Sequence, residues 1–186
     1  MLKKMFKVLR GVTLSLLILS LLSVEVKAET FPVDGHTYRI VSVVNGCAMT
    51  NGNIAEHNAP LFLETANVES EGQEWSFIAL SDKEPLFLIY NANCGQAADM
   101  ALNSSKPGSL LQWEPTMSEN QVFYVELVQG TADVVQLFNA SDRTKAVTAD
   151  GVEQLTLSAS VDSESTHFRL VDLDKQCDIV LPVASE

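Results

Sequence analysis

Four side chains within residues 87–123 have the chemistry that a hydroxyl-rich ligand requires. Asp99 supplies a carboxylate, while Gln112 and Asn120 supply planar amides, and these groups can bond pairs of neighbouring hydroxyls. Trp113 adds an aromatic face that can cover the apolar side of a ring. The residue types therefore fit recognition of a polyhydroxylated ligand such as a sugar.

A catalytic arrangement is not evident from the residues. The histidines His36, His57 and His167 are far apart in the chain, and none has a Ser, Cys or acid at a nucleophile spacing. Carboxylates are abundant, but no pair suited to cleaving a glycosidic bond can be singled out. No Cys or His spacing matches a metal site. We predict a protein that is not an enzyme and that uses no cofactor or metal.

The same order of sequence signals occurs three times. Two sets of residues carry the period: the closing aromatics Trp75, Phe123 and Phe168 recur after 48 and 45 residues, and the opening residues Ile40, Ile89 and Leu137 after 49 and 48. Each copy holds about four short apolar runs separated by Gly, Asn, Asp and Ser. Such a period is typical of repeat architectures. We predict an all-β chain of three pseudo-equivalent four-stranded repeats, at about residues 35–80, 81–128 and 129–173.

The chain begins like an exported protein. A basic start precedes the apolar run 12–22, and Val26-Lys-Ala28 has small residues at −3 and −1, which is typical of a signal peptide over residues 1–28. The run is too short to span a bilayer comfortably, which takes about 20 residues. We predict a secreted or periplasmic protein with one domain at 29–173 and a tail at 174–186.

The charge of the mature chain limits its partners. Removing residues 1–28 takes away five basic residues and one acidic residue, which leaves seven basic and 23 acidic residues, a net charge of −16. Such a surface repels nucleic-acid phosphates and anionic lipid, so we predict neither nucleic-acid binding nor membrane insertion.

Three cysteines remain in the mature chain: Cys47, Cys94 and Cys177. An odd number leaves at least one thiol unpaired within the chain. Cys47 and Cys94 fall in equivalent turns of the first two repeats, and threefold-related sites should be too far apart for a disulfide, whose Cα atoms must come within about 7 Å. If a pair forms, Cys47 with Cys177 is the pair that we suggest, because a closed threefold fold brings its two ends together.

The closing motif of each repeat resembles a known family. It reads Gln73-Glu-Trp75, Gln121-Val-Phe123 and the degenerate Thr166-His-Phe168. This pattern is similar to the Q-x-W repeat of the ricin-type β-trefoil, a lectin domain, and the resemblance covers about residues 35–173. It implies a β-trefoil fold. In physical terms the aromatics can fill a shared core, while the glutamines satisfy backbone groups at the turn.

The resemblance also implies a sugar site, which only the middle repeat retains. The family places an Asp after the second strand, a Gln about thirteen residues later before an aromatic platform, and an Asn before the closing Gln. Repeat two matches with Asp99, Gln112 and Asn120. The corresponding residues are Thr50, Phe62 and Gly72 in repeat one, and Thr148, Thr156 and Ser165 in repeat three. The alternative for Asp99 is a turn acid that caps local backbone amides.

Trp113 departs from the family pattern. The stacking aromatic of the family falls on Glu114, and Trp113 occupies the neighbouring, normally inward position. Trp113 either turns outward as a platform or fills the core. Alternation along a strand puts Trp113 on the face of Leu111, and the equivalent leucines of the other repeats favour that face as core. We therefore expect Trp113 in the core.

These observations predict a secreted, non-catalytic carbohydrate-binding module with at most one competent pocket, in repeat two. There, Asp99 would accept sugar hydroxyls, Gln112 would bridge, and Asn120 would orient Asp99 or donate to the sugar. The alternative is a protein-binding β-trefoil, either an inhibitor or an accessory subunit of a secreted assembly, with vestigial sugar sites. The expected partner is thus a glycan or polysaccharide, or else a secreted or surface protein.

Overall fold

The computed structural model describes residues 31–102, 107–149, 154–159 and 163–174. The predicted signal peptide and nearly all of the predicted tail lie outside these residues, so both remain predictions. Within them, no helix is long and apolar enough to cross a membrane. The described chain forms twelve strands: β1 (Thr37–Ser42), β2 (Cys47–Thr50), β3 (Phe62–Thr65), β4 (Trp75–Ala79), β5 (Leu86–Asn91), β6 (Ala97–Met100), β7 (Leu110–Trp113), β8 (Val122–Leu127), β9 (Val134–Asn139), β10 (Asp142–Thr148), β11 (Thr156–Ser158) and β12 (Phe168–Asp172).

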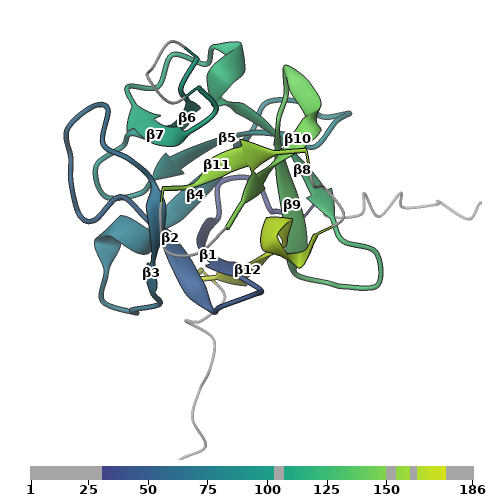
Figure 1. Cartoon of the computed structure of the whole chain (residues 1–186), viewed down its shortest axis with the longest axis horizontal. Helices are drawn as coiled ribbons and strands as arrows, with labels where there is room; N and C mark the ends of the chain where they lie inside the picture. The colour runs from purple at the N-terminus through teal and green to yellow at the C-terminus, as the bar shows by residue number, and fades with distance from the viewer. Residues whose placement is uncertain (1–30, 103–106, 150–153, 160–162, 175–186) are drawn as a thin grey trace, which may run out of the picture.

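Six of the strands close into an antiparallel barrel (Figure 1). β1 pairs with β4, β4 with β5, β5 with β8, β8 with β9, β9 with β12, and β12 returns to β1. The last pairing joins the two ends of the described chain, with Ile40 opposite Leu170. Closure removes the open sheet edges that would otherwise invite aggregation.

The other six strands form three hairpins that cap one end of the barrel: β2–β3, β6–β7 and β10–β11. A ring of three backbone hydrogen bonds joins them, in which Leu61 N donates to Leu110 O, Leu110 N to Leu155 O, and Leu155 N to Leu61 O, at 3.1, 2.8 and 2.8 Å. Each repeat thus supplies four strands in the same order, and the predicted β-trefoil of three four-stranded repeats is confirmed.

The core is built from the same positions of each repeat. These are the closing aromatics Trp75, Phe123 and Phe168, the opening residues Ile40, Ile89 and Leu137, and the hairpin leucines Leu61, Leu110 and Leu155, all at most 1% exposed. Burying side chains of this size stabilises the fold by about 1.5–3 kcal/mol each. The period read from the sequence is therefore the period of the core.

The glutamines of the closing motif hold turns, as predicted. Gln73 donates from Nε2 to Thr65 O at 3.0 Å and accepts from Asn67 N at 2.8 Å. Gln121 makes the equivalent bonds to Glu114 O and Thr116 N, at 2.9 and 2.7 Å. Both side chains are at most 1% exposed, so these bonds satisfy buried amides that could not reach water.

Two of the three cysteines lie in the described residues. Cys47 and Cys94 carry free thiols, and both side chains are partly exposed. Cys177, which we suggested as the partner of Cys47, lies outside the described residues.

The two tryptophans allow a matched test of the core. Trp75 is fully buried and donates from Nε1 to Met49 O at 3.0 Å. We expect Trp75→Phe to lower the free energy of unfolding by about 2–4 kcal/mol, because it leaves a cavity and removes the donor from a buried carbonyl. Trp113→Phe, at a side chain that is 42% exposed, should change it by no more than about 0.5 kcal/mol. Urea unfolding followed by circular dichroism measures both, and equal losses would contradict this account of the core.

Candidate functional site

Asp99 lies on β6, in the hairpin at the upper left of Figure 1. Its Oδ1 accepts from Asn120 Nδ2 at 2.7 Å, and its Oδ2 accepts from Gln121 Nε2 at 2.9 Å. Both donors come from the 3-10 helix Glu119–Gln121, one short turn before β8. Asp99 is 6% exposed, and the donors to its carboxylate are side-chain amides rather than the local backbone amides of a turn acid. The structure therefore brings Asp99 and Asn120 together and holds the carboxylate in one orientation.

The surroundings of Asp99 disfavour its negative charge. Burial raises the pKa of this carboxyl from the ordinary value of 3.8, and the hydrogen bonds from Gln121 and Asn120 offset only part of that effect. A hydroxyl that donates to this carboxylate would replace some of the hydration that burial removes, so the site gains from a ligand rich in donors.

Trp113 faces the same side as Asp99. In the pairing of β6 with β7, Asp99 lies opposite Leu111 and Ala97 lies opposite Trp113. Residues opposite each other in an antiparallel pair share a face, as do residues two apart along a strand. Gln112 therefore points to the other face. The carboxylate and the exposed indole lie on one side of the hairpin, where one ligand can reach both.

The prediction that Trp113 fills the core beside Leu111 is wrong. Ala97, opposite Trp113, corresponds to Ala48, which lies opposite Glu64, and to Ala146, which lies opposite Ser158. The inward positions of the three hairpins are therefore Leu110 and Gln112, Leu61 and Leu63, and Leu155 and Leu157. The alignment from sequence was shifted by one residue, and such a shift moves every side chain of a strand to the other face.

Gln112 does not join Asp99. Its side chain is fully buried on the opposite face, at a position that is leucine in both other repeats. Nε2 donates to Ile54 O at 2.7 Å and to Glu56 O at 2.8 Å, and Oε1 accepts from Asn51 Nδ2 at 2.9 Å. All of these partners belong to repeat one. The geometry gives Gln112 a role in joining repeats, not the predicted bridge to a sugar.

Sequence reasoning missed one neighbour of Trp113. The ring of His57, from the loop of repeat one that Gln112 holds, lies 5.4 Å from the indole ring, between centroids, with an interplanar angle of 37°. His57 Nδ1 is 2.8 Å from Gln96 Oε1. His57 and Trp113 are 56 residues apart in the sequence and belong to different repeats. No sequence pattern indicates which loop of one repeat contacts the next repeat.

Repeats one and three do not reproduce the Asp99 site. Thr50 and Thr148 occupy the position of Asp99, and the position of Asn120 holds Gly72 and Ser165. In repeat one the loop folds over this position, since Asn53 Oδ1 accepts from Gly72 N at 2.6 Å. A Cβ on Gly72 would lie 2.5 Å from Asn51 Oδ1, so no side chain fits there. Within the described residues, the carboxylate and the aromatic coincide in repeat two.

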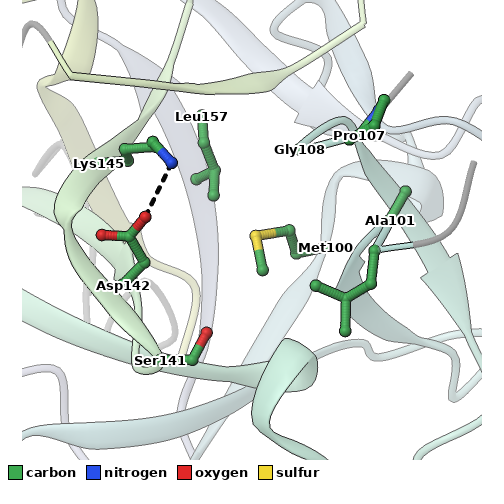
Figure 2. Close-up of a pocket in the computed structure, with 9 residues that line it drawn as sticks. Met100, Ala101, Pro107, Gly108, Ser141, Asp142, Lys145 and Leu157 are labelled. Carbon is green, nitrogen blue, oxygen red and sulfur yellow. Dashed lines mark hydrogen bonds and ion pairs between the residues drawn. The ribbon is translucent and has the colours of Figure 1, made fainter.

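The junction of repeats two and three contains a pocket of about 420 Å³ (Figure 2). Leu157, which corresponds to Gln112, is one of its lining residues. Figure 2 shows the ion pair of Lys145 and Asp142 on one side, with an Nζ to Oδ2 distance of 2.9 Å, and Ala101, Pro107 and Gly108 on the other. Hydrogen bonds from Thr144 and Lys145 lower the pKa of Asp142 to about 2, which favours the charged form that pairs with Lys145. The pocket offers an apolar floor with a charged rim and no aromatic platform among its lining residues.

One cluster in the described residues has the side chains of a metal site. The ligand atoms of His36, Asp172 and Asp174 lie within 4.8 Å of one another, where β1 meets β12. His36 Nδ1 is 3.1 Å from Asp172 Oδ2, and Thr37 N donates to Asp174 Oδ2 at 2.7 Å. The three side chains already bond to each other and to the backbone, and they serve to fasten the first strand to the last.

Comparison with known proteins shows the fold. No family profile and no curated sequence matches the chain. Among solved structures, the designed threefold symmetric protein ThreeFoil matches with a TM-score of 0.65 and 18% identity, over 74% of this chain and 99% of the other. The Polyporus squamosus lectin, bound to the human-type influenza-binding epitope Neu5Acα2-6Galβ1-4GlcNAc, matches with a TM-score of 0.60 and 15% identity, over 75% of this chain and 50% of the lectin.

A third match is part of an enzyme. The exo-β-1,3-galactanase 1,3Gal43A from Clostridium thermocellum has a TM-score of 0.64 and 18% identity, over 75% of this chain and 31% of the enzyme. At such identities the likeness is one of fold. This chain is thus similar to a designed trefoil, to half of a lectin and to one third of a glycoside-cleaving enzyme, in agreement with the ricin-type pattern of its repeats.

The raised pKa of Asp99 has a consequence for stability that pH can test. The folded state binds the proton of Asp99 more tightly than the unfolded state does. The contribution of this group to the free energy of unfolding is therefore largest below pH 3.8. Its contribution is lost as pH rises from 3.8 through the raised pKa. We expect the free energy of unfolding of the wild type, minus that of Asp99→Asn, to fall over this window and to be flat on either side. Urea unfolding of both proteins from pH 3 to 7 at constant salt measures it, and a difference that rises with pH would contradict the assignment.

Proposed function

We propose that this chain is an exported, non-catalytic carbohydrate-binding module whose site lies in repeat two. The observation that carries the proposal is the shared face of the β6–β7 hairpin, on which the oriented carboxylate of Asp99 lies beside the exposed indole of Trp113. Sugar recognition needs both of these groups, one for the hydroxyls and one for the apolar side of the ring. A lectin and a glycoside-cleaving enzyme among the proteins of similar fold support this choice of ligand class.

Asp99 would act as the hydroxyl acceptor. An ionised carboxylate offers about four lone-pair sites, and the amides of Asn120 and Gln121 use one on each oxygen. The remaining sites can accept from a pair of sugar hydroxyls. Because Gln121 is fully buried, the carboxylate is already fixed before the ligand arrives, and less conformational entropy is lost on binding.

The charges around the site favour a neutral sugar. Glu56, Glu114 and Glu119 are exposed, and each is a chain neighbour of a residue at or beside the site. The whole chain has a net charge of −12. An anionic glycan would meet like charges here, which disfavours its binding. We therefore expect the neutral disaccharide Galβ1-4GlcNAc to be a better probe than the sialylated form of it that the Polyporus lectin holds.

The second candidate is a protein-binding trefoil. The threonines at the Asp99 position of repeats one and three favour it, because two of the three repeats lack the acid of a sugar site. A protein interface would be broad and would not depend on Asp99 in particular. The two functions therefore differ in their response to one substitution.

A glycan-array screen of residues 29–186 tests the proposal. We expect binding to one or more neutral glycans, and a loss of about tenfold to a hundredfold in Asp99→Ala, the size expected for removing a charged hydrogen-bond acceptor. Trp113→Ala, at an exposed position, should weaken the binding of the same glycans without affecting folding. Thr50→Ala and Thr148→Ala are the matched controls in the other repeats and should bind as the wild type does.

Two results would overturn the proposal. One is a blank array for folded protein, which would favour the protein-binding alternative. The other is a glycan that binds equally well to the wild type, Asp99→Ala and Trp113→Ala, which would put any sugar site elsewhere.

A further inference from the structure

We propose that the ligand site spans two repeats, and that it takes an oligosaccharide of at least two rings rather than a single sugar. In this arrangement the loop of residues 54–58, here called the repeat-one loop, adds His57 to the site, and the buried amide of Gln112 positions that loop. The inference rests on the proposed function of the Asp99 face and extends it to a second subsite.

The first line of evidence is the chemistry of Gln112. The other two repeats have leucine at this inward position, Leu63 and Leu157, so the trefoil core does not require an amide there. A buried amide is tolerated only when its polar atoms are bonded. Gln112 meets that condition through carbonyls of the repeat-one loop, Ile54 O and Glu56 O. The amide of Gln112 therefore bonds to the repeat-one loop and is not needed to pack the core.

The second line of evidence is the backbone of the same segment. Asn58 N donates to Gln112 O at 2.8 Å, and Gln112 N donates to Ala59 O at 2.9 Å. Asn51, which is 1% exposed, donates from Nδ2 to both Ile54 O and Gln112 Oε1. The repeat-one loop is therefore held from both of its ends and from beneath, although its own side chains are exposed.

This anchoring places His57 at the outer side of Trp113. The amide oxygen Oε1 of Gln96 can only accept, so the 2.8 Å contact makes Nδ1 of His57 the donor. In the neutral imidazole, Nε2 of His57 is then an acceptor near the exposed indole, and the amide Nε2 of Gln96, whose Oε1 contacts His57, is a donor. A donor and an acceptor beside an aromatic face form a second set of groups for sugar hydroxyls.

The two sets of groups are separated along the hairpin. Gln96 comes directly before Ala97, which is opposite Trp113, and Asp99 comes two residues after Ala97. At about 3.3 Å per residue, the backbone distance from Gln96 to Asp99 is about 10 Å along the chain. A single sugar ring held by Asp99 would not span this distance to Gln96, and a second ring is needed to do so.

The pseudo-equivalent junction has no amide at the position of Gln112. Between repeats two and three, Leu157 stands at the position of Gln112, and the pocket of about 420 Å³ lies open there (Figure 2). Lys145 takes the position of Gln96, and Ser158 takes that of Trp113. Within the described residues, the buried amide, the histidine and the exposed tryptophan occur together at the junction of repeats one and two.

Isothermal titration calorimetry of residues 29–186 with galactose and with Galβ1-4GlcNAc tests the second subsite. If the array identifies another glycan, that glycan and its terminal monosaccharide replace this pair. For the wild type we expect the disaccharide to bind at least about tenfold more tightly than the monosaccharide. His57→Ala and Gln112→Leu should lose about tenfold in disaccharide affinity, with monosaccharide affinity unchanged within about twofold. His167→Ala is the matched control in repeat three and should behave as the wild type does.

Fluorescence gives a test of the positioning role without a ligand. The chain has two tryptophans, of which Trp75 is fully buried, so acrylamide quenching reports mainly on Trp113. We expect stronger quenching in Gln112→Leu and in His57→Ala than in the wild type, and Trp113→Phe gives the signal of Trp75 alone. A core-packing role for Gln112 would leave the quenching unchanged, because leucine fills this position in the other repeats.

The outcomes separate the two proposals. Equal affinity for the mono- and disaccharide, or a disaccharide affinity that His57→Ala and Gln112→Leu leave unchanged, would overturn the two-repeat site and leave the Asp99 site standing. Absence of binding to every glycan on the array would overturn the proposed function and, with it, the second subsite.

Discussion

The ring of backbone hydrogen bonds among Leu61, Leu110 and Leu155 is the constraint on which the rest of the structure depends. Each of these bonds joins the hairpin of one repeat to the hairpin of the next, so the three caps cannot separate while the ring is closed. In repeat one, the loop before β3 lies against the second repeat, where its carbonyls accept from Gln112. A β-trefoil assembled in this way can combine side chains of two repeats at each junction as well as within a repeat.

Gln112 shows how one polar residue changes such a junction. A leucine at this position would bury apolar surface without any requirement for partners, whereas an amide must find them or destabilise the fold by about 1–3 kcal/mol for each unbonded group. Both acceptors of the Gln112 Nε2 group, Ile54 O and Glu56 O, lie in repeat one, and Oε1 accepts from Asn51 of repeat one and from the thiol of Cys94. A leucine here would accept many arrangements of its neighbours, whereas the amide requires specific partners. Gln112 therefore holds a surface loop in one defined position. Such an arrangement is useful only where the position of the loop matters.

The fold could be predicted from the sequence because it depends on residue types that recur. The closing aromatics and glutamines keep their period and their roles, and so they indicate the repeats and the core. The face of Trp113 could not be read in the same way. Leu110 and Leu111 are adjacent leucines, and Leu61-Phe62-Leu63 is apolar throughout, so alternation fits two registers equally well.

The motif Ser-Glu-x-Gln at residues 70–73 and 118–121, with Ser-Glu-x-Thr at 163–166, is the signal that aligns the 3-10 turns before each closing strand. It aligns the third strands of repeats two and three, since Trp113 and Ser158 each precede the motif by five residues, but not that of repeat one, where the equivalent Glu64 precedes it by six.

The contact of His57 with Trp113 could not be predicted for a different reason: it joins two repeats through a loop, and only the closed ring of hairpins brings the two together.

The same contact explains how one site could suffice. A single shallow subsite binds a sugar weakly, and lectins usually compensate with several sites that act together. Here the other two repeats lack the acid, and a net charge of −12 opposes clustering of the chains by self-association. In the proposed site, tighter binding would then come from lengthening that one site. A loop held from below by a buried amide would lengthen it without adding flexible groups that binding would have to order.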